Sequence, residues 1–350
     1  MRATEILLIG PAGKQTGGIA RYIHEQRRRL GDGARVYDVA VPDSETPLQF
    51  LRAALLALAQ LVQFPFRRPP DVVHVHTSHW YSFFQSSAYI LYAASVWRVP
   101  VVLHVHGSSF DTFVDTESRL LGAFQSFVFA RCTTVVVLSD YWSDVVADRV
   151  DPAKLFVLPN AVDPTDYDPR YGASPPHVVF VSNHIERKGV AEFVAAVDDL
   201  LEAGARMQVT IAGSGPLSHL AEELAARRAA VTYEGYVSET RKRELLNEGS
   251  VFVLPTHAEN LPIALLEAMA GGNALVSTTV GAIPSLVDDD NGVLVAPGDE
   301  VALRGALSSL LADPTRIESM ARTSRARAER EYSWRTAVDS LEGLYAELAH

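Results

Sequence analysis

The sequence is poor in cysteine and gives no sign of a secretion signal. Its single cysteine, Cys132, cannot form an internal disulfide, so nothing calls for an oxidising compartment. A lone cysteine is more often a small buried hydrophobic residue than a nucleophile. The first residues lack a signal-peptide pattern, because Met1–Thr4 leads directly into the short run Glu5–Gly10. We therefore expect a cytoplasmic protein.

Long uninterrupted apolar runs and an excess of positive charge are also lacking. The longest apolar stretch, 48–66, is interrupted by Gln49, Arg52, Gln60 and Gln63 and is too short to span a bilayer comfortably, so we expect a soluble protein. Basic residues number 31 against 42 acidic ones, a net charge of −11. This balance argues against a nucleic-acid binder, which needs a basic surface to neutralise phosphates. Nearly all the basic residues are arginine, and the lysines are Lys14, Lys154, Lys188 and Lys242.

What the sequence does contain is a regular alternation of short β-branched runs with helical patterns, which predicts parallel α/β units. The length of 350 residues favours two domains. Residues 162–176 contain four prolines and no apolar periodicity, so they are predicted as a linker. We expect doubly wound, Rossmann-like domains at 1–161 and 177–332, with a helix at 333–350 packing back on the first domain. Ligands of such folds lie at the carboxyl ends of the strands.

The individual elements follow from the same patterns. The expected strands are 5–10, 35–41, 71–77, 100–107, 133–140 and 154–160 in the first half, and 177–183, 207–213, 230–235, 251–256, 274–278 and 292–296 in the second. The expected helices are 17–30, 48–64, 81–98, 115–131, 190–203, 216–228, 238–248, 262–270, 300–311 and 333–348.

A glycine-rich turn, Gly10–Gly18, follows the first expected strand and precedes a helix. Such a turn lets backbone N–H groups approach a phosphate at the positive end of the helix. It is not a P-loop, because Leu8 and Gln15 occupy positions that the signature reserves, and it lacks the spacing of a dinucleotide fingerprint. Either phosphate contact or a tight turn without a ligand explains it.

The segment 256–272 carries two carboxylates in an otherwise apolar setting. Pro262 is typical of a helix start, with Asn260 as its expected N-cap, and Glu259 then lies in a loop above a strand end. Glu267 falls on a helix that offers almost no solvated face, so its burial costs several kcal/mol unless it is hydrogen-bonded. A ribose diol or a salt bridge to a neighbouring arginine would satisfy Glu267. The alternative for Glu259 is a solvated loop carboxylate.

The segment 183–189 follows the first strand of the second half. Lys188 is a rare lysine in an arginine-rich chain, which suggests that a compact ammonium is needed there, although a solvated surface lysine is the alternative. A cation at a strand-to-helix turn can neutralise a diphosphate leaving group. Further along, 212–216 places small residues at another strand end, where a ligand could lie on the backbone.

Histidines occur in two groups that each contain a His-x-His pair, His74-x-His76-x-x-His79 and His104-x-His106. Two such pairs can suggest a metal-dependent hydrolase, but no acidic residue follows at either strand end to complete the site. We therefore expect no metal. His106, before Gly107, is the histidine best placed to touch a substrate, and the others are predicted to be core residues.

Together these segments resemble the retaining glycosyltransferases of family 4, which have the GT-B fold. The resemblance covers most of the chain and is most specific in the second half, where the Glu-x7-Glu motif is Glu259 and Glu267. Other matching segments are Gly17-Gly18, His106-Gly107, Lys188-Gly189, Ala212–Pro216 and Asn291-Gly292.

The resemblance implies a nucleoside-diphosphate sugar donor, a UDP- or GDP-sugar, held mainly by the second domain across a central cleft, and no requirement for a metal. It implies that Glu259 binds the hydroxyls of the transferred sugar, Lys188 the diphosphate and Glu267 the ribose, with His106 beside the sugar. Glu259, His106 and Lys188 are thus the expected catalytic residues. The expected nucleotide-sugar site consists of Gly17, Gly18, Arg187, Lys188, Gly213, Ser214, Gly215, Asn260, Leu261, Ile263 and Glu267.

The sequence departs from the family pattern in ways that make the donor sugar unsafe to infer. The family's arginine five residues before the lysine is Asn183 here, which leaves the diphosphate site one cation short unless Arg187 or Lys14 substitutes. Ala282 and Ser285 replace a common Gly and Glu. The triplet 166–168 mimics a metal-binding Asp-x-Asp but falls in the predicted linker.

The acceptor is expected at the first domain, as a glycan or a lipid-linked glycan. The apolar helix 48–66 is followed by Arg67-Arg68, and 80–97 is rich in aromatics (Trp80, Tyr81, Phe83, Phe84, Tyr89, Tyr92, Trp97). Either core packing or contact of 48–68 with the inner face of a membrane explains these features. The competing functions are a GT-B epimerase or phosphorylase-like enzyme, a nicotinamide oxidoreductase, which the missing fingerprint disfavours, and a non-catalytic nucleotide-sugar-binding protein.

Overall fold

The computed structural model describes residues 4–12, 18–40 and 47–349. The chain divides into two compact units, one of 1–159 with 337–350 and the other of 160–336. The predicted linker, 162–176, therefore belongs to the second unit rather than between two domains. Its Asp166 ends a short 3-10 turn, Pro164–Asp166, and Tyr167 is buried.

The first unit is built on a six-stranded parallel sheet with the order β2-β1-β3-β4-β5-β6. The chain starts at β1, adds β2 on one side and then crosses to β3 on the other, so β1 and β3 flank the point where the winding direction reverses. The strands are β1 (Ile6–Gly10), β2 (Ala34–Asp38), β3 (Val72–Thr77), β4 (Val101–Val105), β5 (Thr134–Val137) and β6 (Leu155–Val157).

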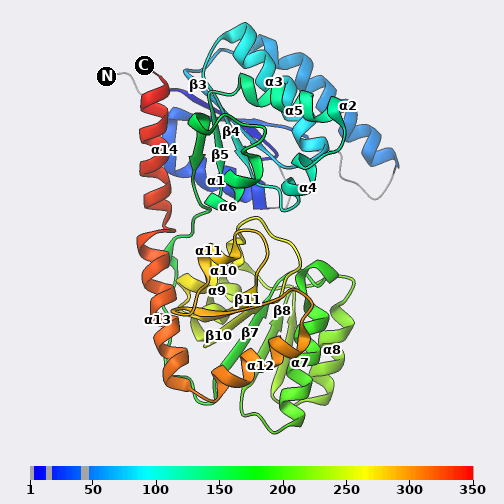
Figure 1. Cartoon of the computed structure of the whole chain (residues 1–350), viewed down its shortest axis with the longest axis vertical. Helices are drawn as coiled ribbons and strands as arrows, with labels where there is room; N and C mark the ends of the chain where they lie inside the picture. Colours follow the sequence, from blue (N-terminus) through cyan, green and yellow to red (C-terminus); the bar gives the residue numbers. More distant parts are fainter. Residues whose placement is uncertain (1–3, 13–17, 41–46, 350) are drawn as a thin grey trace. The chain divides into compact units, whose positions relative to one another are not determined.

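Helices connect these strands and cover the sheet (Figure 1). The apolar core includes Phe83, whose ring centroid lies 5.1 Å from that of Phe113. Cys132 is buried as predicted, and burial raises the pKa of its thiol to about 12. The helices are α1 (Gly18–Leu30), α2 (Pro47–Gln63), α3 (Tyr81–Tyr92), which continues as a π-helical turn (Ala93–Trp97), α4 (Phe110–Val114), α5 (Arg119–Arg131), α6 (Asp140–Val146) and α14 (Trp334–Leu348).

The carboxyl-terminal helix α14 packs on the first unit, as predicted. Tyr345 is buried, and its hydroxyl accepts a hydrogen bond from Gln26 Nε2 at 2.9 Å and lies 2.5 Å from His74 Nδ1. Because Gln26 lies on α1 and His74 on β3, one tyrosine fastens the last helix to the centre of the unit.

The second unit contains another six-stranded parallel sheet, with the order β12-β11-β10-β7-β8-β9. Here the chain runs from β7 through β8 to β9 and then crosses to β10, so the winding reverses between β7 and β10. The strands are β7 (His177–Val181), β8 (Gln208–Ala212), β9 (Val231–Gly235), β10 (Val251–Leu254), β11 (Ala274–Thr278) and β12 (Gly292–Val295).

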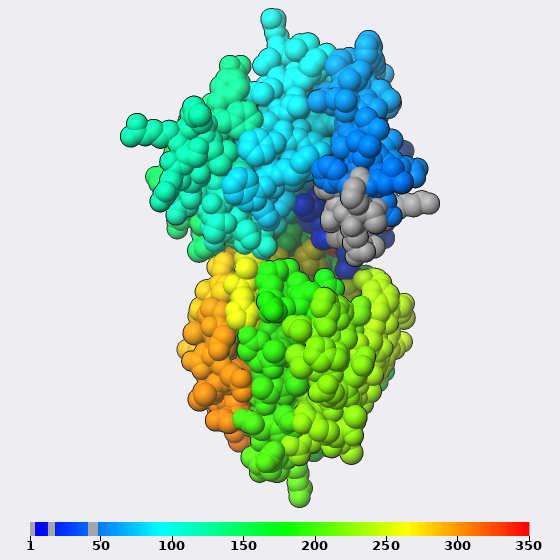
Figure 2. Space-filling view, turned by 90° about the vertical axis from the view of Figure 1, so that its right-hand side faces the viewer, coloured from blue at the N-terminus to red at the C-terminus, as the bar shows by residue number. Residues whose placement is uncertain are grey.

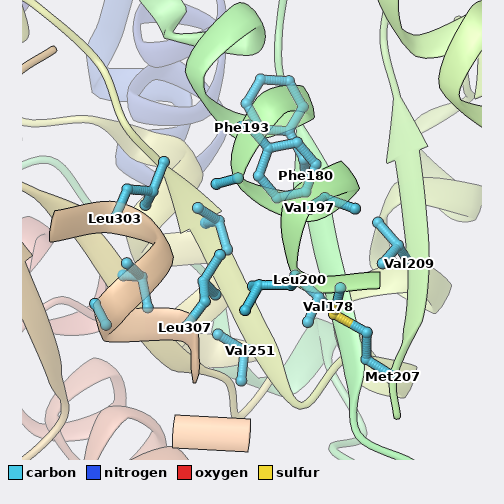
Figure 3. Close-up of a cluster of buried hydrophobic side chains, with 14 of the residues drawn as sticks. Val178, Phe180, Phe193, Val197, Leu200, Met207, Val209, Val251, Leu303 and Leu307 are labelled. Atoms are coloured by element: carbon cyan, nitrogen blue, oxygen red, sulfur yellow. The ribbon is translucent and has the colours of Figure 1, made fainter. Parts of the chain in front are cut away.

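The core of this unit forms where α7 and α12 pack together on the sheet. The close-up shows Phe180 of β7 against Phe193 of α7, with ring centroids 4.9 Å apart (Figure 3). Leu303 and Leu307 extend the cluster from α12. The helices are α7 (Val190–Glu202), α8 (Ser218–Arg227), α9 (Glu239–Glu248), α10 (Ile263–Ala270), α11 (Ile283–Leu286), α12 (Glu300–Leu311) and α13 (Pro314–Arg330).

The predicted strands are all present, but four helices were not predicted: α4, α6, α11 and α13. The longest, α13, is strongly polar and buries only a narrow stripe, which includes Ile317, Met320 and Ala321. The sequence does signal the start of α13, because the Asp313 side chain accepts a hydrogen bond from Arg316 N as the N-cap and Pro314 is the first helical residue. The two sheets, their helices and the fastened carboxyl terminus together confirm the predicted doubly wound fold.

Candidate functional site

The charged candidate site lies in the second unit, in the loops that follow β7 and β10. Glu259 Oε1 forms an ion pair with Lys188 Nζ, and Arg187 Nη1 lies 3.4 Å from the same oxygen. Lys188 follows β7 and Glu259 follows β10, the two strands where the winding reverses. Open α/β sheets bind ligands in the crevice outside the carboxyl ends of such strands. The structure thus brings together two segments, 183–189 and 256–272, that lie far apart in the sequence.

Backbone contacts hold these two loops against each other. His257 N donates to Arg187 O at 2.8 Å, and Thr256 Oγ1 donates to the same carbonyl at 2.8 Å. Gly189 adopts a φ of +70°, and a Cβ there would lie 2.0 Å from the carbonyl oxygen of Pro255. Glycine after Lys188 is therefore required by the close approach of the two loops.

The ion pair is largely shielded from water. The Glu259 side chain is 10% exposed and that of Lys188 is 15% exposed, whereas Arg187 is 39% exposed. Arg187 is also anchored, since its Nη1 donates to Ala258 O at 2.6 Å. A desolvated carboxylate needs a charged or hydrogen-bonding partner, and removing one member of such a pair is costly. Glu259 is therefore not a solvated loop carboxylate.

Glu267 is buried on α10 and meets a lysine rather than an arginine. Lys242 Nζ on α9 lies 2.9 Å from Glu267 Oε1 and 2.9 Å from Glu239 Oε2. The predicted alternative of a salt bridge at Glu267 is thus confirmed, but the partner is Lys242 and not an arginine. The structure leaves the predicted ribose contact untested.

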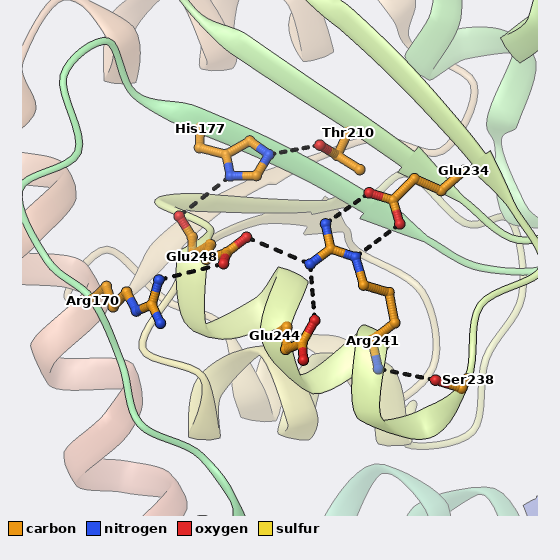
Figure 4. A network of polar contacts seen from close by, with 8 residues as sticks. All are labelled: Arg170, His177, Thr210, Glu234, Ser238, Arg241, Glu244 and Glu248. Carbon is orange, nitrogen blue, oxygen red and sulfur yellow. Dashed lines mark hydrogen bonds and ion pairs between the residues drawn. The ribbon is translucent and has the colours of Figure 1, made fainter.

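The adjacent residue, Arg241, fixes α9 to the sheet (Figure 4). Its Nε and Nη2 donate to the two carboxylate oxygens of Glu234 on β9 at 2.9 and 2.8 Å. These hydrogen bonds hold the pKa of the Glu234 carboxyl below its usual value. The same guanidinium contacts Glu244 and Glu248 of its own helix. Lys242 therefore reaches Glu267 from a helix whose position is fixed by an extended ion-pair network.

The turn Gly213-Ser214-Gly215 follows β8, as predicted, and contacts the loop after β7. Gly213 has a φ of +124°, and a Cβ there would lie 1.8 Å from Ser182 O. The N–H of Gly213 donates to Gly235 O at 2.7 Å and that of Gly215 to Ser218 Oγ at 2.9 Å. Close packing within the protein therefore accounts for both glycines without a ligand.

The start of α10 differs from the prediction. Pro262 occupies the N-cap position and the helix begins at Ile263, so Asn260 is not the N-cap. Asn260 and Leu261 are buried in the preceding turn, where their carbonyls accept from Ala282 N at 3.0 Å and from Asn160 Nδ2 at 2.7 Å. Proline without a side-chain cap is sufficient here because these tertiary bonds fix the turn.

In the first unit, part of the predicted phosphate turn can be located. Gly18 is the first residue of α1 and has open space around its Cα, whereas Gly17 and Lys14 lie outside the described residues. The turn therefore stays a prediction.

The histidines of the first unit form a stacked cluster on β3 and β4. Ring centroids of His74 and His76 are 4.5 Å apart, and those of His104 and His106 are 4.1 Å apart. His74, His76 and His104 are buried, as predicted for core residues, and His106 is partly exposed after β4. The core prediction is wrong for His79, which is also partly exposed. Hydrogen bonds cross between the strands, from His74 Nε2 to His104 Nδ1 at 3.2 Å and from His76 Nδ1 to His106 Nε2 at 3.0 Å.

Burial keeps this cluster neutral. Desolvation lowers the pKa of both His74 and His106 to about 3, and it lowers the pKa values of His76 and His104 well below the usual range.

Ligand atoms of His74, His76 and His104 lie within 4.8 Å of one another, close enough to hold a metal ion. Both ring nitrogens of His74 have protein partners, because Nδ1 contacts Tyr345 and Nε2 contacts His104.

One residue at the site was overlooked in the sequence. Lys242 carries the same signal that singled out Lys188, a rare lysine in an arginine-rich chain, and it contacts the second glutamate of the motif. Asn183, where the family has arginine, is exposed, and Arg187 is the second cation next to Glu259.

Both halves of the chain match known glycosyltransferase families. Residues 5–161 match the family described as glycosyl transferase 4-like domain, and residues 175–313 match glycosyl transferases group 1. The chain is 31% identical over 360 residues to alpha-maltose-1-phosphate synthase of Mycolicibacterium smegmatis, covering 91% of this chain and 88% of that protein. It is 27% identical over 239 residues to glycogen synthase of Mycobacterium tuberculosis, an alignment that covers 65% of this chain and 57% of that protein.

Solved structures show the same fold. Sucrose-phosphate synthase from Thermosynechococcus elongatus superposes with a TM-score of 0.80 at 17% identity, over 99% of both chains. HepE from Anabaena, in complex with UDP, superposes with a TM-score of 0.77 at 15% identity, over 98% of this chain and 100% of that one. With both halves matched in sequence and the whole chain matched in structure, this protein belongs to the group 1, family 4 glycosyltransferases with the GT-B fold.

Proposed function

We propose that the chain is a retaining glycosyltransferase that transfers a sugar from a UDP- or GDP-sugar to a glycan or lipid-linked glycan without a metal ion. The observation that carries the proposal is the pairing of Lys188 and Arg187 with Glu259 where the winding of the second sheet reverses. HepE, a structural neighbour, is known in complexes with UDP and with UDP-glucose, which favours UDP as the first nucleotide to test.

The paired charges suit a ligand that carries both phosphate and hydroxyl groups. Two cations share one carboxylate here, so the phosphates of a diphosphate can replace that carboxylate as their partner. When the diphosphate takes Lys188 and Arg187, the Glu259 carboxylate can accept hydrogen bonds from the sugar. Arg187 thus substitutes for the family arginine that Asn183 replaces.

The buried Glu267 would accept from the ribose hydroxyls, with Lys242 holding its carboxylate in place. The turn 213–215 and the chain at Asn260, Leu261 and Ile263 would line the nucleotide site. A site with its own cations has less need of a divalent ion at the diphosphate, which supports metal independence.

The reaction itself is the one that the family resemblance implies. The bond between the anomeric carbon and the leaving phosphate oxygen breaks, and a bond to the acceptor oxygen forms on the same face. The acceptor proton passes to the leaving phosphate. His106 is neutral near pH 7, because its pKa is about 3, so it would contact the sugar as an uncharged hydrogen-bonding group.

A thermal-shift panel of UDP, GDP, ADP and TDP in the presence of EDTA tests the donor site. A nucleotide at 100 times its Kd should stabilise the folded chain by about 2.7 kcal/mol. If no nucleotide raises the melting temperature, the donor-site proposal fails. If stabilisation appears only when a divalent metal is added, metal independence fails.

Product analysis separates transfer from the competing activities. With a radiolabelled donor and a glycan acceptor, we expect label in the glycan with retained anomeric configuration. Label recovered only in an epimerised nucleotide sugar would indicate an epimerase. Binding of the donor without any product would indicate a binding protein.

A further inference from the structure

Helix α2 presents apolar side chains to solvent along nearly its whole length. Leu48 is 77% exposed, Leu55 58% and Leu58 57%, and the helix continues into Phe66, which is 86% exposed. Within 48–66 only Ala57 and Phe64 are buried. In the space-filling view the blue atoms of this region lie at the surface of the first unit (Figure 2). Apolar surface of this extent usually marks a site of interaction.

Core packing, one of the two explanations given above for this stretch, is therefore wrong for α2. The Gln60 side chain attaches the helix to the first unit, because its Oε1 accepts from Ala40 N at 2.8 Å and its Nε2 donates to Asp38 O at 3.0 Å. Contrary to the expectation from the sequence, the segment 48–66, with a mean hydropathy of 1.3, is long and apolar enough to cross a membrane by length and composition. Its attachment leaves the apolar side chains of the first three turns facing outward.

The sheet excludes a membrane-spanning arrangement for α2. The helix lies between β2 and β3 in the chain, and both strands pair in parallel with β1. A helix that crossed a bilayer once would place β2 and β3 on opposite sides of it. Since one strand cannot pair with both across a membrane, α2 can only lie along a surface.

A cavity rich in arginine lies at the carboxyl end of α2. It has a volume of about 320 Å³ and is lined by Gln60 and Gln63 of the helix and by Arg35, Arg67 and Arg68. Arg67 lies over the ring of Tyr37, 5.5 Å from its centroid. Arg35 and Arg68 share one acidic partner, Glu5, at 3.4 and 3.8 Å. Asp38 also lines the cavity, so three arginines lie there next to two carboxylates, Glu5 and Asp38, in a chain of net charge −11.

We propose that α2 and this arginine-lined cavity, here called the α2 surface, bind the surface of an anionic phospholipid bilayer. The exposed leucines and Phe66 enter the boundary between headgroups and acyl chains, and Arg35, Arg67 and Arg68 contact lipid phosphates. An anionic bilayer repels the acidic chain elsewhere, so the basic end of α2 also sets the orientation. Amphipathic helices with a basic edge bind membrane interfaces in this way.

The inference stands on the α2 surface alone and does not require the proposed transfer reaction. If both hold, the enzyme works on an acceptor held at the membrane, which favours a lipid-linked glycan over a soluble one.

Vesicle flotation of the full chain tests the proposal without donor or acceptor. We expect binding to vesicles of phosphatidylcholine with phosphatidylglycerol, weaker binding to phosphatidylcholine alone, and release as the salt concentration rises. The double variant Leu51→Glu/Leu55→Glu should abolish binding. Arg67→Glu/Arg68→Glu should lower the partition coefficient by at least twentyfold, about fivefold for each arginine removed.

Control variants place glutamate at exposed positions of the second unit. Val301→Glu should bind vesicles like the unchanged chain, and so should Arg227→Glu/Arg330→Glu. All variants should keep the nucleotide-induced thermal shift, which shows that they are folded.

Three results would overturn the proposal. The first is failure of the unchanged chain to float with anionic vesicles, and the second is equal binding by the Leu51→Glu/Leu55→Glu variant. The third is a stable dimer by light scattering that this variant converts to a monomer, which would assign the α2 surface to a second copy of the chain. Loss of transfer with vesicle binding intact would contradict the proposed function and leave this inference standing.

Discussion

The two sheets carry different chemistry at their strand ends, although both are parallel and doubly wound. In the second unit, the loops after β7 and β10 bring a carboxylate together with two cations. In the first unit, β3 and β4 bring four imidazoles into a stack that burial keeps neutral. The strand ends of the second unit therefore carry charged side chains, whereas the histidines of the first unit are uncharged.

This difference follows from solvation. Glu259 and Lys188 compensate each other, so the pair can be buried without a large loss of stability. The histidines contact one another and Tyr345, none of which carries a charge at neutral pH, so protonation is disfavoured. Changes at the charged residues of the second unit should therefore affect ligand binding and turnover. Changes in the histidine stack of the first unit should instead affect how stability depends on pH.

The largest effect is expected from Glu259→Gln. The amide cannot replace the carboxylate in binding the transferred sugar, so transfer should fall by about a thousandfold while nucleotide affinity is kept. Steady-state kinetics with calorimetric nucleotide titration measures both. Glu202→Gln, at an exposed position, is the matched control. Transfer at the unchanged rate in the Glu259 variant would show that Glu259 takes no part in the reaction.

The histidine stack should make stability depend strongly on pH. In the unfolded chain, histidines become protonated below a pKa of about 6.5, whereas burial lowers the pKa of His74 and His106 in the folded chain to about 3. Between these values the unfolded state binds more protons, so the free energy of unfolding falls as the pH falls. The slope should rise from near zero above pH 7.5, through about 0.7 kcal/mol per pH unit for each histidine at pH 6.5, to about 1.4 kcal/mol per pH unit below pH 5.5. Urea denaturation between pH 7.5 and 5.5 measures it.

His106→Gln should reduce the slope of the free energy of unfolding against pH by the contribution of one histidine. His219→Gln, at an exposed position, should leave this slope unchanged. A free energy of unfolding that does not vary over this pH range would contradict the neutral stack.

A smaller effect is expected from Glu267→Ala. Loss of the ribose contact should weaken nucleotide binding by about tenfold. The fold should survive, because Lys242 keeps Glu239 as a partner. Calorimetric titration of the nucleotide measures the loss. The same affinity in the variant would leave the Glu267–Lys242 pair with a structural role only.

The smallest effect is expected from Arg187→Ala. Arg187 is more exposed than Lys188 and lies farther from Glu259, so its removal should weaken binding of the nucleoside diphosphate only a few-fold. Arg170→Ala, an exposed arginine of the same unit, is the control. A loss as large as that of a Lys188 variant would make Arg187 the principal cation.

The fold was predictable because strand and helix periods alternate along most of the chain. The polar helix α13 was not, since its buried stripe is narrow and includes small residues such as Ala321, Ser324 and Ala328. Exposure of α2 could not be read from its composition, because an apolar helix on a core and one on a surface have the same sequence pattern.

At the site, the sequence supplied the separate residues but not their pairing. That Lys188 meets Glu259 depends on the order of β7 and β10 in the sheet, which is a long-range property. Lys242 was overlooked for the same reason, because only packing of α9 on α10 brings it to Glu267.

The central claim, that Lys188 next to Glu259 binds the diphosphate, is tested most directly by comparing diphosphate and monophosphate binding. The nucleoside diphosphate selected by the thermal-shift panel and its monophosphate are titrated calorimetrically into the unchanged chain and into Lys188→Gln. We predict that the unchanged chain prefers the diphosphate by about tenfold and that the variant loses this preference. An equal preference in both proteins would contradict the account.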